Sequence, residues 1–152
     1  MFNSLVRARP AGRGCCSVKG GMTTAELIHA YFDAVNRHDA EGMLALVSED
    51  VIHDINEGGR EIGKEKFRAF KAHMDRCYRE QITELVVMEN GSFGAAEFLC
   101  SGEYLATDSG LSEATGQKYA IPAAAFFECR NGQIVRVTSY YNLRQWISAV
   151  GG

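Results

Sequence analysis

The first half of the chain repeats its hydrophobic positions at helical spacing. Thr23 and Glu26 stand at the spacing of a capping box, and an apolar stripe follows them, which predicts a first helix. Asp39 can cap a second, shorter helix, and a third is expected over about 64–79 after Gly63. The apolar stripes of these helices are Leu27, Ile28, Tyr31, Phe32 and Val35, then Met43, Leu44, Leu46 and Val47, then Phe67, Phe70, Met74 and Cys77.

From residue 81 onward the hydrophobic period changes from helical to alternating, which is typical of strands. Strands are predicted over 82–88, 95–105, 118–129 and 134–141, with Asn90-Gly91 as a hairpin turn and a helical turn over 143–147. An earlier strand is predicted over 51–56. The order α-α-β-α-β-β-β-β therefore predicts an α+β fold in which helices cover one face of a curved antiparallel sheet.

The strand over 51–56 holds the candidate chemistry, because a histidine, an aspartate and an asparagine interrupt its aliphatic residues. Successive side chains of a strand point to opposite faces, so His53 lies on one face while Asp54 and Asn56 lie on the other. At most one of the two titratable groups can therefore face a cavity. The alternative is an exposed edge strand that carries no chemistry.

Composition and charge are those of a globular protein and argue against nucleic-acid binding. Of the 152 residues, 46% are hydrophobic and 23% are charged, an ordinary balance for one soluble domain. Residues 1–21 carry four basic residues and no acid, whereas the remainder carries 12 basic against 19 acidic residues, a poor match to a phosphate backbone. No apolar run is long enough to span a membrane. Neither nucleic acid nor a membrane is expected as a partner.

The same features divide the chain and predict its compartment. Residues 1–21 lack periodicity and predict a disordered basic extension, whereas residues 22–150 form a single domain. The extension faintly resembles an organelle transit peptide; the alternatives are a tail without a role and a true start at Met22. Five cysteines without CxxC spacing predict reduced thiols and a cytoplasmic location. Neither a metal nor a cofactor is predicted, because no metal spacing links His29, His38, His53 and His73.

Several short segments carry a resemblance to a known family over about residues 24–148. They are Tyr31-Phe32-Asp33-Ala34-Val35-Asn36, Asp39 with Gly42 and Ala45-Leu46, the acid after His53, Gly63-Lys64 with Phe67, and Asn131-Gly132 with Ile134. With these residues, the chain resembles the nuclear-transport-factor-two-like superfamily, and within it the ketosteroid isomerase and SnoaL-like polyketide cyclase families. The resemblance implies a cone-shaped, curved sheet packed with the N-terminal helices around an apolar cavity, a cystatin-like α+β roll.

The resemblance also implies roles for individual residues. In ketosteroid isomerase an aspartate abstracts the proton, and a tyrosine and a protonated aspartate stabilise the enolate. The tyrosine falls on Tyr31 and the base on Asp54, the latter with one residue of slippage. The second acid falls within 123–125, where three alanines stand, so this chain lacks that donor. Asn56 is the expected partner of Asp54 if that carboxylate is buried.

Alternation along the later strands predicts the walls of the cavity. The residues expected on the cavity face are Phe98, Cys100, Gly102 and Tyr104, then Ala124 and Phe126, then Val137, Ser139 and Tyr141. The expected cavity is mostly apolar, and each of its tyrosines also fits a packed core position with a satisfied hydroxyl. On the opposite face Glu97, Leu99, Ser101 and Glu103 alternate, and the family resemblance implies a homodimer through that face.

Three functions fit the sequence. The first is a cofactor-free isomerase or cyclase-like enzyme, in which Asp54 abstracts a proton α to a carbonyl and Tyr31 donates to the enolate oxygen. Its ligand would be a small apolar ketone, steroid-like or polyketide-like. The second is a dehydratase that uses His53, if the strand has the opposite register. The third is a non-catalytic ligand-binding or dimerisation module, which an ion pair between Asp54 and a neighbouring arginine would favour.

Overall fold

The computed structural model describes residues 21–56 and 58–151, and the predicted disordered extension, apart from Gly21, lies outside them. The helices are α1 (Thr24–Asn36), α2 (Ala40–Ala45), α3 (Lys64–Cys77) and α4 (Leu143–Val150). The strands are β1 (Val47–Asp54), β2 (Arg60–Ile62), β3 (Tyr78–Asn90), β4 (Phe93–Tyr104), β5 (Lys118–Arg130) and β6 (Gln133–Tyr141). The predicted α+β class is confirmed.

Helices α1 and α2 begin where their capping residues predict. The Thr23 hydroxyl accepts a hydrogen bond from the Glu26 backbone N–H at 3.1 Å, and the Glu26 carboxylate accepts one from the Thr23 N–H at 2.7 Å. Asp39 caps α2 by accepting from the Gly42 N–H at 2.8 Å. The apolar stripe of α1 is buried against the sheet, with Ile28 fully buried.

The strands form one sheet in the order β2-β1-β6-β5-β4-β3. Neighbouring strands are antiparallel except β1 and β6, which run parallel. The antiparallel prediction therefore holds for the meander from β3 to β6 and fails where β1 pairs with the last strand. Strand β2 was not predicted because three residues are too few to show an alternating pattern. Strand β1 starts at Val47 rather than 51, because residues 48–50 extend instead of turning.

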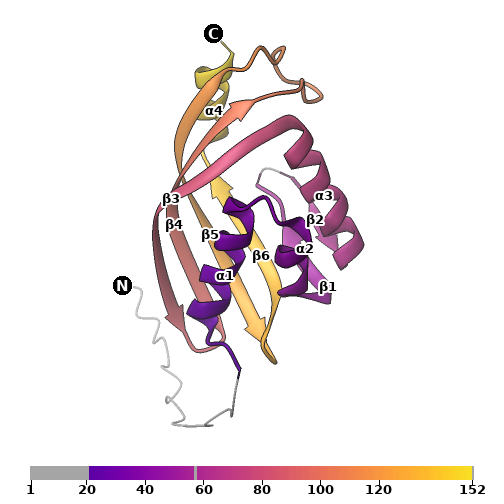
Figure 1. Cartoon of the computed structure of the whole chain (residues 1–152), viewed down its shortest axis with the longest axis vertical. Helices are drawn as coiled ribbons and strands as arrows, with labels where there is room; N and C mark the ends of the chain where they lie inside the picture. The colour runs from indigo at the N-terminus through magenta and orange to yellow at the C-terminus, as the bar shows by residue number, and fades with distance from the viewer. Residues whose placement is uncertain (1–20, 57, 152) are drawn as a thin grey trace, which may run out of the picture.

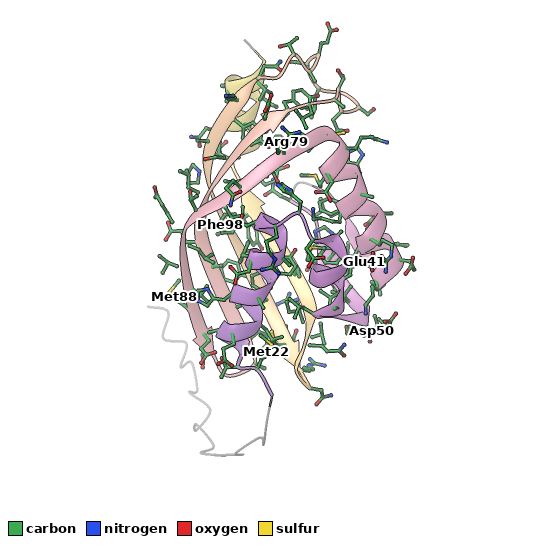
Figure 2. The ribbon with its side chains drawn as sticks, viewed as in Figure 1. Met22, Glu41, Asp50, Arg79, Met88 and Phe98 are labelled. Atoms are coloured by element: carbon green, nitrogen blue, oxygen red, sulfur yellow. The ribbon has the colours of Figure 1, made fainter. Side chains whose placement is uncertain are left out.

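Figure 1 shows the sheet bending around helices that lie on one of its faces. Helix α1 packs on β3 and β4, α3 packs on β1, and α4 contacts β5 at the far end of the sheet. In Figure 2 Met88 projects from β3 away from the helices, whereas Phe98 packs on Phe32 of α1 with ring centroids 4.9 Å apart. The inner face thus holds the core, and the outer face meets solvent. Within the described residues no helix has both the length and the apolar character needed to cross a bilayer.

The register of β5 corrects one part of the predicted cavity wall. Ala125 and Phe127 are buried, whereas Phe126 is 49% exposed and packs on Tyr140 at the outer face. The prediction that Phe126 faces the cavity is therefore wrong. Two adjacent phenylalanines and a run of alanines leave the alternation ambiguous here, and a shift of one residue reverses every side chain. On β4, Phe98 and Cys100 line the cavity as predicted, whereas Tyr104 points inward but is fully buried and does not line it.

Candidate functional site

A cavity of about 390 Å³ lies between the helices and the inner face of the sheet. A volume of this size is within the range of small-molecule sites. Helices α1 and α3 and strands β1, β3, β4, β5 and β6 all contribute to its walls, which are mostly apolar. The apolar and aromatic side chains include Tyr31, Phe32, Phe70, Met74, Phe98 and Ile121.

Strand β1 places His53 in this cavity. The residue is 4% exposed, and its ring lies edge-on to Phe67 and Phe70 with centroid separations of 4.9 and 4.5 Å. Its Nδ1 atom is buried and has no hydrogen-bond partner among the described residues. Burial lowers the pKa of the imidazole, and the carboxylates of Glu61 and Asp54 oppose that shift only in part. His53 is therefore a neutral imidazole at neutral pH, the form that accepts a proton.

Asp54 points to the opposite face, so the predicted placement of this carboxylate in the cavity is wrong. It accepts hydrogen bonds from Arg60 Nε at 2.6 Å, from Arg60 Nη2 at 3.1 Å and from the Thr138 hydroxyl at 3.2 Å. The Arg60 hydrogen bond is the main cause of a lowered pKa, so Asp54 is ionised and a weak base. Asn56, the expected partner of Asp54, instead accepts a hydrogen bond from the Tyr141 N–H at 3.2 Å.

Helix α1 brings Tyr31 to the cavity wall. The ring packs edge-on against Phe32 and Phe127, with centroid separations of 5.4 and 5.5 Å. Burial raises the pKa of the phenol well above its ordinary value, so the hydroxyl keeps its proton. Within the described part of the chain no hydrogen bond to this hydroxyl is formed. Tyr31 can therefore donate to a ligand.

The other predicted wall residues differ in position. Those that line the cavity are Asn56, Phe98, Cys100, Ala124, Val137, Ser139 and Tyr141, and Ala124 also borders the outer face. Tyr104 lies behind the wall, fully buried and stacked on Tyr78 with ring centroids 5.4 Å apart. Its hydroxyl accepts a hydrogen bond from the Asp108 N–H at 2.7 Å. Tyr104 is thus a packed core residue with a satisfied hydroxyl.

A second polar cluster at the cavity wall was not predicted. His73 on α3, Tyr78 on β3 and Asp108 in the loop after β4 meet there. The His73 Nε2 atom and the Tyr78 hydroxyl lie 3.0 and 2.8 Å from Asp108 Oδ2. The Cys77 sulfur lies within 4.8 Å of a ring nitrogen of His73 and a carboxylate oxygen of Asp108. The sequence signal is the one-turn spacing of His73 and Cys77 on a helix, but Asp108 stands 35 residues away from His73, so no local pattern links it to them.

Comparisons with known proteins agree with the fold. The SnoaL-like domain family matches residues 28–137. A candidate polyketide cyclase from Pseudomonas putida is 55% identical over 86% of this chain and 99% of its own, with a TM-score of 0.84. Another from Silicibacter is 52% identical over 83% and 93%, with a TM-score of 0.81. A Catenulispora acidiphila protein with a ketosteroid isomerase-like fold, in complex with trimethylamine, is 21% identical over 85% and 95%, with a TM-score of 0.70. No curated protein matches the chain.

Proposed function

Because the chain belongs to the SnoaL-like family, we propose that it is a cyclase or isomerase that abstracts a proton α to the carbonyl of a small apolar, polyketide-like ketone. The similarity to the candidate polyketide cyclase from Pseudomonas putida supports this reaction class. The base in this proposal is His53 rather than Asp54, since His53 lines the cavity and Asp54 does not. The reaction needs no cofactor.

The observation that carries the proposal is the neutral imidazole of His53 at the wall of an apolar cavity, with its Nδ1 atom buried and without a hydrogen-bond partner among the described residues. Leaving a buried polar atom without a hydrogen bond costs about 1–3 kcal/mol, so such an atom in a folded protein calls for an explanation. Because Nδ1 is closed off, the ring nitrogen that can take an α-proton from a ligand in the cavity is Nε2. His53 is neutral at neutral pH and therefore needs no prior deprotonation to act as a base.

The cavity also supplies a donor for the charge that proton abstraction creates. When His53 takes the α-proton, the electron pair of the C–H bond moves into the carbonyl, and the enolate oxygen becomes negative. The Tyr31 hydroxyl, which lines the same cavity, can donate to that oxygen. The carboxylates of Glu61 and Asp54 favour the imidazolium that forms. With a β,γ-unsaturated ketone, His53 returns the proton to the γ-carbon of the dienolate, which moves the double bond and isomerises the ligand. With a second carbonyl in the ligand, the enolate carbon attacks it and closes a ring, and the alkoxide that forms takes the proton back from His53.

Deuterium exchange tests the first step without knowledge of the natural substrate. The protein is incubated in D₂O with a panel of aryl ketones, bicyclic ketones and 1,3-diketones, and deuterium at the α-carbon is measured by mass spectrometry. We expect wild-type protein to accelerate exchange and His53→Gln to lose about 10²–10⁴ of that acceleration. His29→Gln is the matched control, because His29 is exposed on α1 outside the cavity, and it should exchange at the wild-type rate. Equal rates for His53→Gln and wild type would refute His53 as the base.

The ion pair of Asp54 with Arg60 favours a second candidate, a binding module without catalysis. Native mass spectrometry of the same ketone panel separates the two. Ketones that bind the cavity and are not exchanged by wild-type protein would support the binding module. The dehydratase alternative also uses His53. It predicts that a β-hydroxyketone loses water, which mass spectrometry detects as a product lighter than the substrate by one water molecule.

We also propose that the outer face of the sheet pairs with a second copy of the chain. The strand register places apolar residues of this face next to one another on neighbouring strands. Met88 of β3 lies opposite Ala95 of β4, which in turn lies opposite Phe126 of β5. Ala124 of β5 lies opposite Tyr140 of β6. The large, half-exposed side chains on this face are Val86, Met88, Phe126 and Tyr140. Contiguous exposed apolar surface of this kind is typical of an interface.

A further inference from the structure

We propose that His73, Cys77 and Asp108 form a site for a divalent transition-metal ion such as zinc at the wall of the cavity. Their ligand atoms all lie within 4.8 Å of one another. Helix α3 places His73 and Cys77 one turn apart on the same face, and the loop after β4 brings Asp108 to them. This site goes beyond the proposed proton abstraction and does not rest on it.

The donor atoms fit zinc chemistry. An imidazole nitrogen, a thiolate sulfur and a carboxylate oxygen are the ligand types of zinc, and catalytic zinc sites use three protein ligands with a fourth position open. Zinc–ligand bonds of the usual length separate tetrahedral ligand atoms by about 3.3–3.6 Å. His73 Nε2 and Asp108 Oδ2 are 3.0 Å apart, and the sulfur lies within 4.8 Å of a ligand atom of each residue. Metal binding therefore requires the nitrogen and the oxygen to separate by a few tenths of an ångström and the sulfur to approach by at most about 1.2 Å. A thiolate selects against magnesium and calcium, which prefer oxygen ligands.

The surroundings hold the carboxylate of Asp108 in place. The Tyr78 hydroxyl donates to Oδ2 at 2.8 Å, and the Ser109 N–H donates to Oδ1 at 2.8 Å. Hydrogen bonds of this kind orient a ligand and are found around metal sites. Cys77 is fully buried and is not in a disulfide. Since His73, Tyr78 and Asp108 line the cavity, water or a carbonyl oxygen of a cavity ligand can fill the open position.

The hydrogen bond between Arg76 and His73 opposes metal binding, although the metal and Arg76 use different nitrogens of the ring. Its Nη2 atom lies 3.0 Å from His73 Nδ1, and because arginine only donates, Nδ1 accepts and Nε2 carries the proton toward Asp108. A metal at Nε2 moves that proton to Nδ1, where it meets the guanidinium donor. Arg76 is exposed and can turn into solvent. Removing this arginine should therefore tighten metal binding, a result that a purely structural hydrogen-bond cluster does not predict.

Cobalt is the probe, because a thiolate bound to Co²⁺ gives a charge-transfer absorption band. The full chain is stripped with chelator and titrated with Co²⁺ without substrate, so the result is independent of the proposed reaction. We expect one Co²⁺ per chain with a thiolate band, which Zn²⁺ displaces. Cys77→Ser should lose the band, and Asp108→Asn should weaken binding by at least about 10–100-fold, the loss expected even for an outer-shell partner. Arg76→Gln should bind more tightly than wild type.

The matched control is Cys100→Ser, which removes another buried thiol of the cavity wall and should keep the band. Circular dichroism checks the fold of every variant. If Cys77→Ser does not fold, His73→Gln and Asp108→Asn carry the test, because both residues are partly exposed. Absence of saturable Co²⁺ binding by wild-type protein overturns the proposal. So does a thiolate band that survives Cys77→Ser, or unchanged affinity in Arg76→Gln.

Discussion

Replacing His53 by phenylalanine tests whether this imidazole is neutral in the folded protein. Phenylalanine keeps the edge-on contacts with Phe67 and Phe70 and removes the unpartnered nitrogen. Removing a buried polar atom without a partner gains about 1–3 kcal/mol. The larger ring costs part of that gain, although the neighbouring cavity gives it room. At pH 7.5 we therefore expect His53→Phe to be more stable than the wild type by roughly 1 kcal/mol.

The difference in the free energy of unfolding between His53→Phe and the wild type should also depend on pH, and this dependence tests the protonation state of His53 directly. In the unfolded chain the pKa of His53 is the ordinary 6.5, and burial lowers it in the folded protein. Below pH 6.5 the unfolded state binds the proton and the folded state does not, so acid destabilises wild-type protein. The wild-type protein has its full free energy of unfolding above the unfolded pKa of His53, and this free energy decreases as the pH drops below that pKa. At one pH unit below the unfolded pKa, the stability lost amounts to up to about 1.4 kcal/mol.

The measurement is urea unfolding of both proteins at pH 7.5 and pH 5.5, followed by the fluorescence of Trp146, the single tryptophan of the chain. His29, His38 and His73 are present in both proteins, so their contributions cancel in the difference. We expect the stability advantage of His53→Phe to grow by about 1 kcal/mol on acidification. An advantage that stays constant or shrinks would show that His53 is protonated in the folded protein, which removes the neutral base from the proposed mechanism.

Three further predictions concern other residues. Tyr31→Phe should lower α-deuterium exchange by roughly 10²–10³ without unfolding the protein, because it removes only the donor to the enolate; an unchanged exchange rate would contradict that role. Asp54→Asn should lower the free energy of urea unfolding by only about 1 kcal/mol, because the ion pair that it removes is half exposed on the Arg60 side. It should affect exchange far less than His53→Gln does, and an equal loss of exchange would contradict the assignment of the base. Phe126→Glu should convert a dimer into a monomer in light scattering, because it places a charge in the proposed interface; a monomer in wild-type protein would refute the dimer.

Local sequence patterns determined most of the fold. The capping box at Thr23 and the helical stripe behind it set α1, and the change to alternation set the meander from β3 to β6. Such signals depend on neighbours within a few residues, so they can be recognised without the tertiary structure. They placed Tyr31 on the apolar face of its helix and Phe98 and Cys100 on one face of their strand, and the family resemblance implied the cavity that these residues line.

The tertiary structure decided which face of β1 meets the cavity. Alternation shows that His53 and Asp54 point in opposite directions, but it does not show which direction is inward. The pairing of β1 with β6 and β2 sets that choice: it opposes Asp54 to Thr138 and Arg60 at the outer face and leaves His53 on the cavity side. Strand β2 is too short to be read from the sequence, so its arginine could not be foreseen as the partner of Asp54.

The cluster of His73, Cys77 and Asp108 shows the same division. The one-turn spacing of the first two residues was visible on the predicted helix, whereas Asp108 follows 35 residues after His73 and meets it only when the loop after β4 folds back over α3. Sequence periodicity reports which residues share a face of one element. Which faces of distant elements meet depends on strand order and on the packing of helices against the sheet, and these long-range contacts exist only in the folded chain.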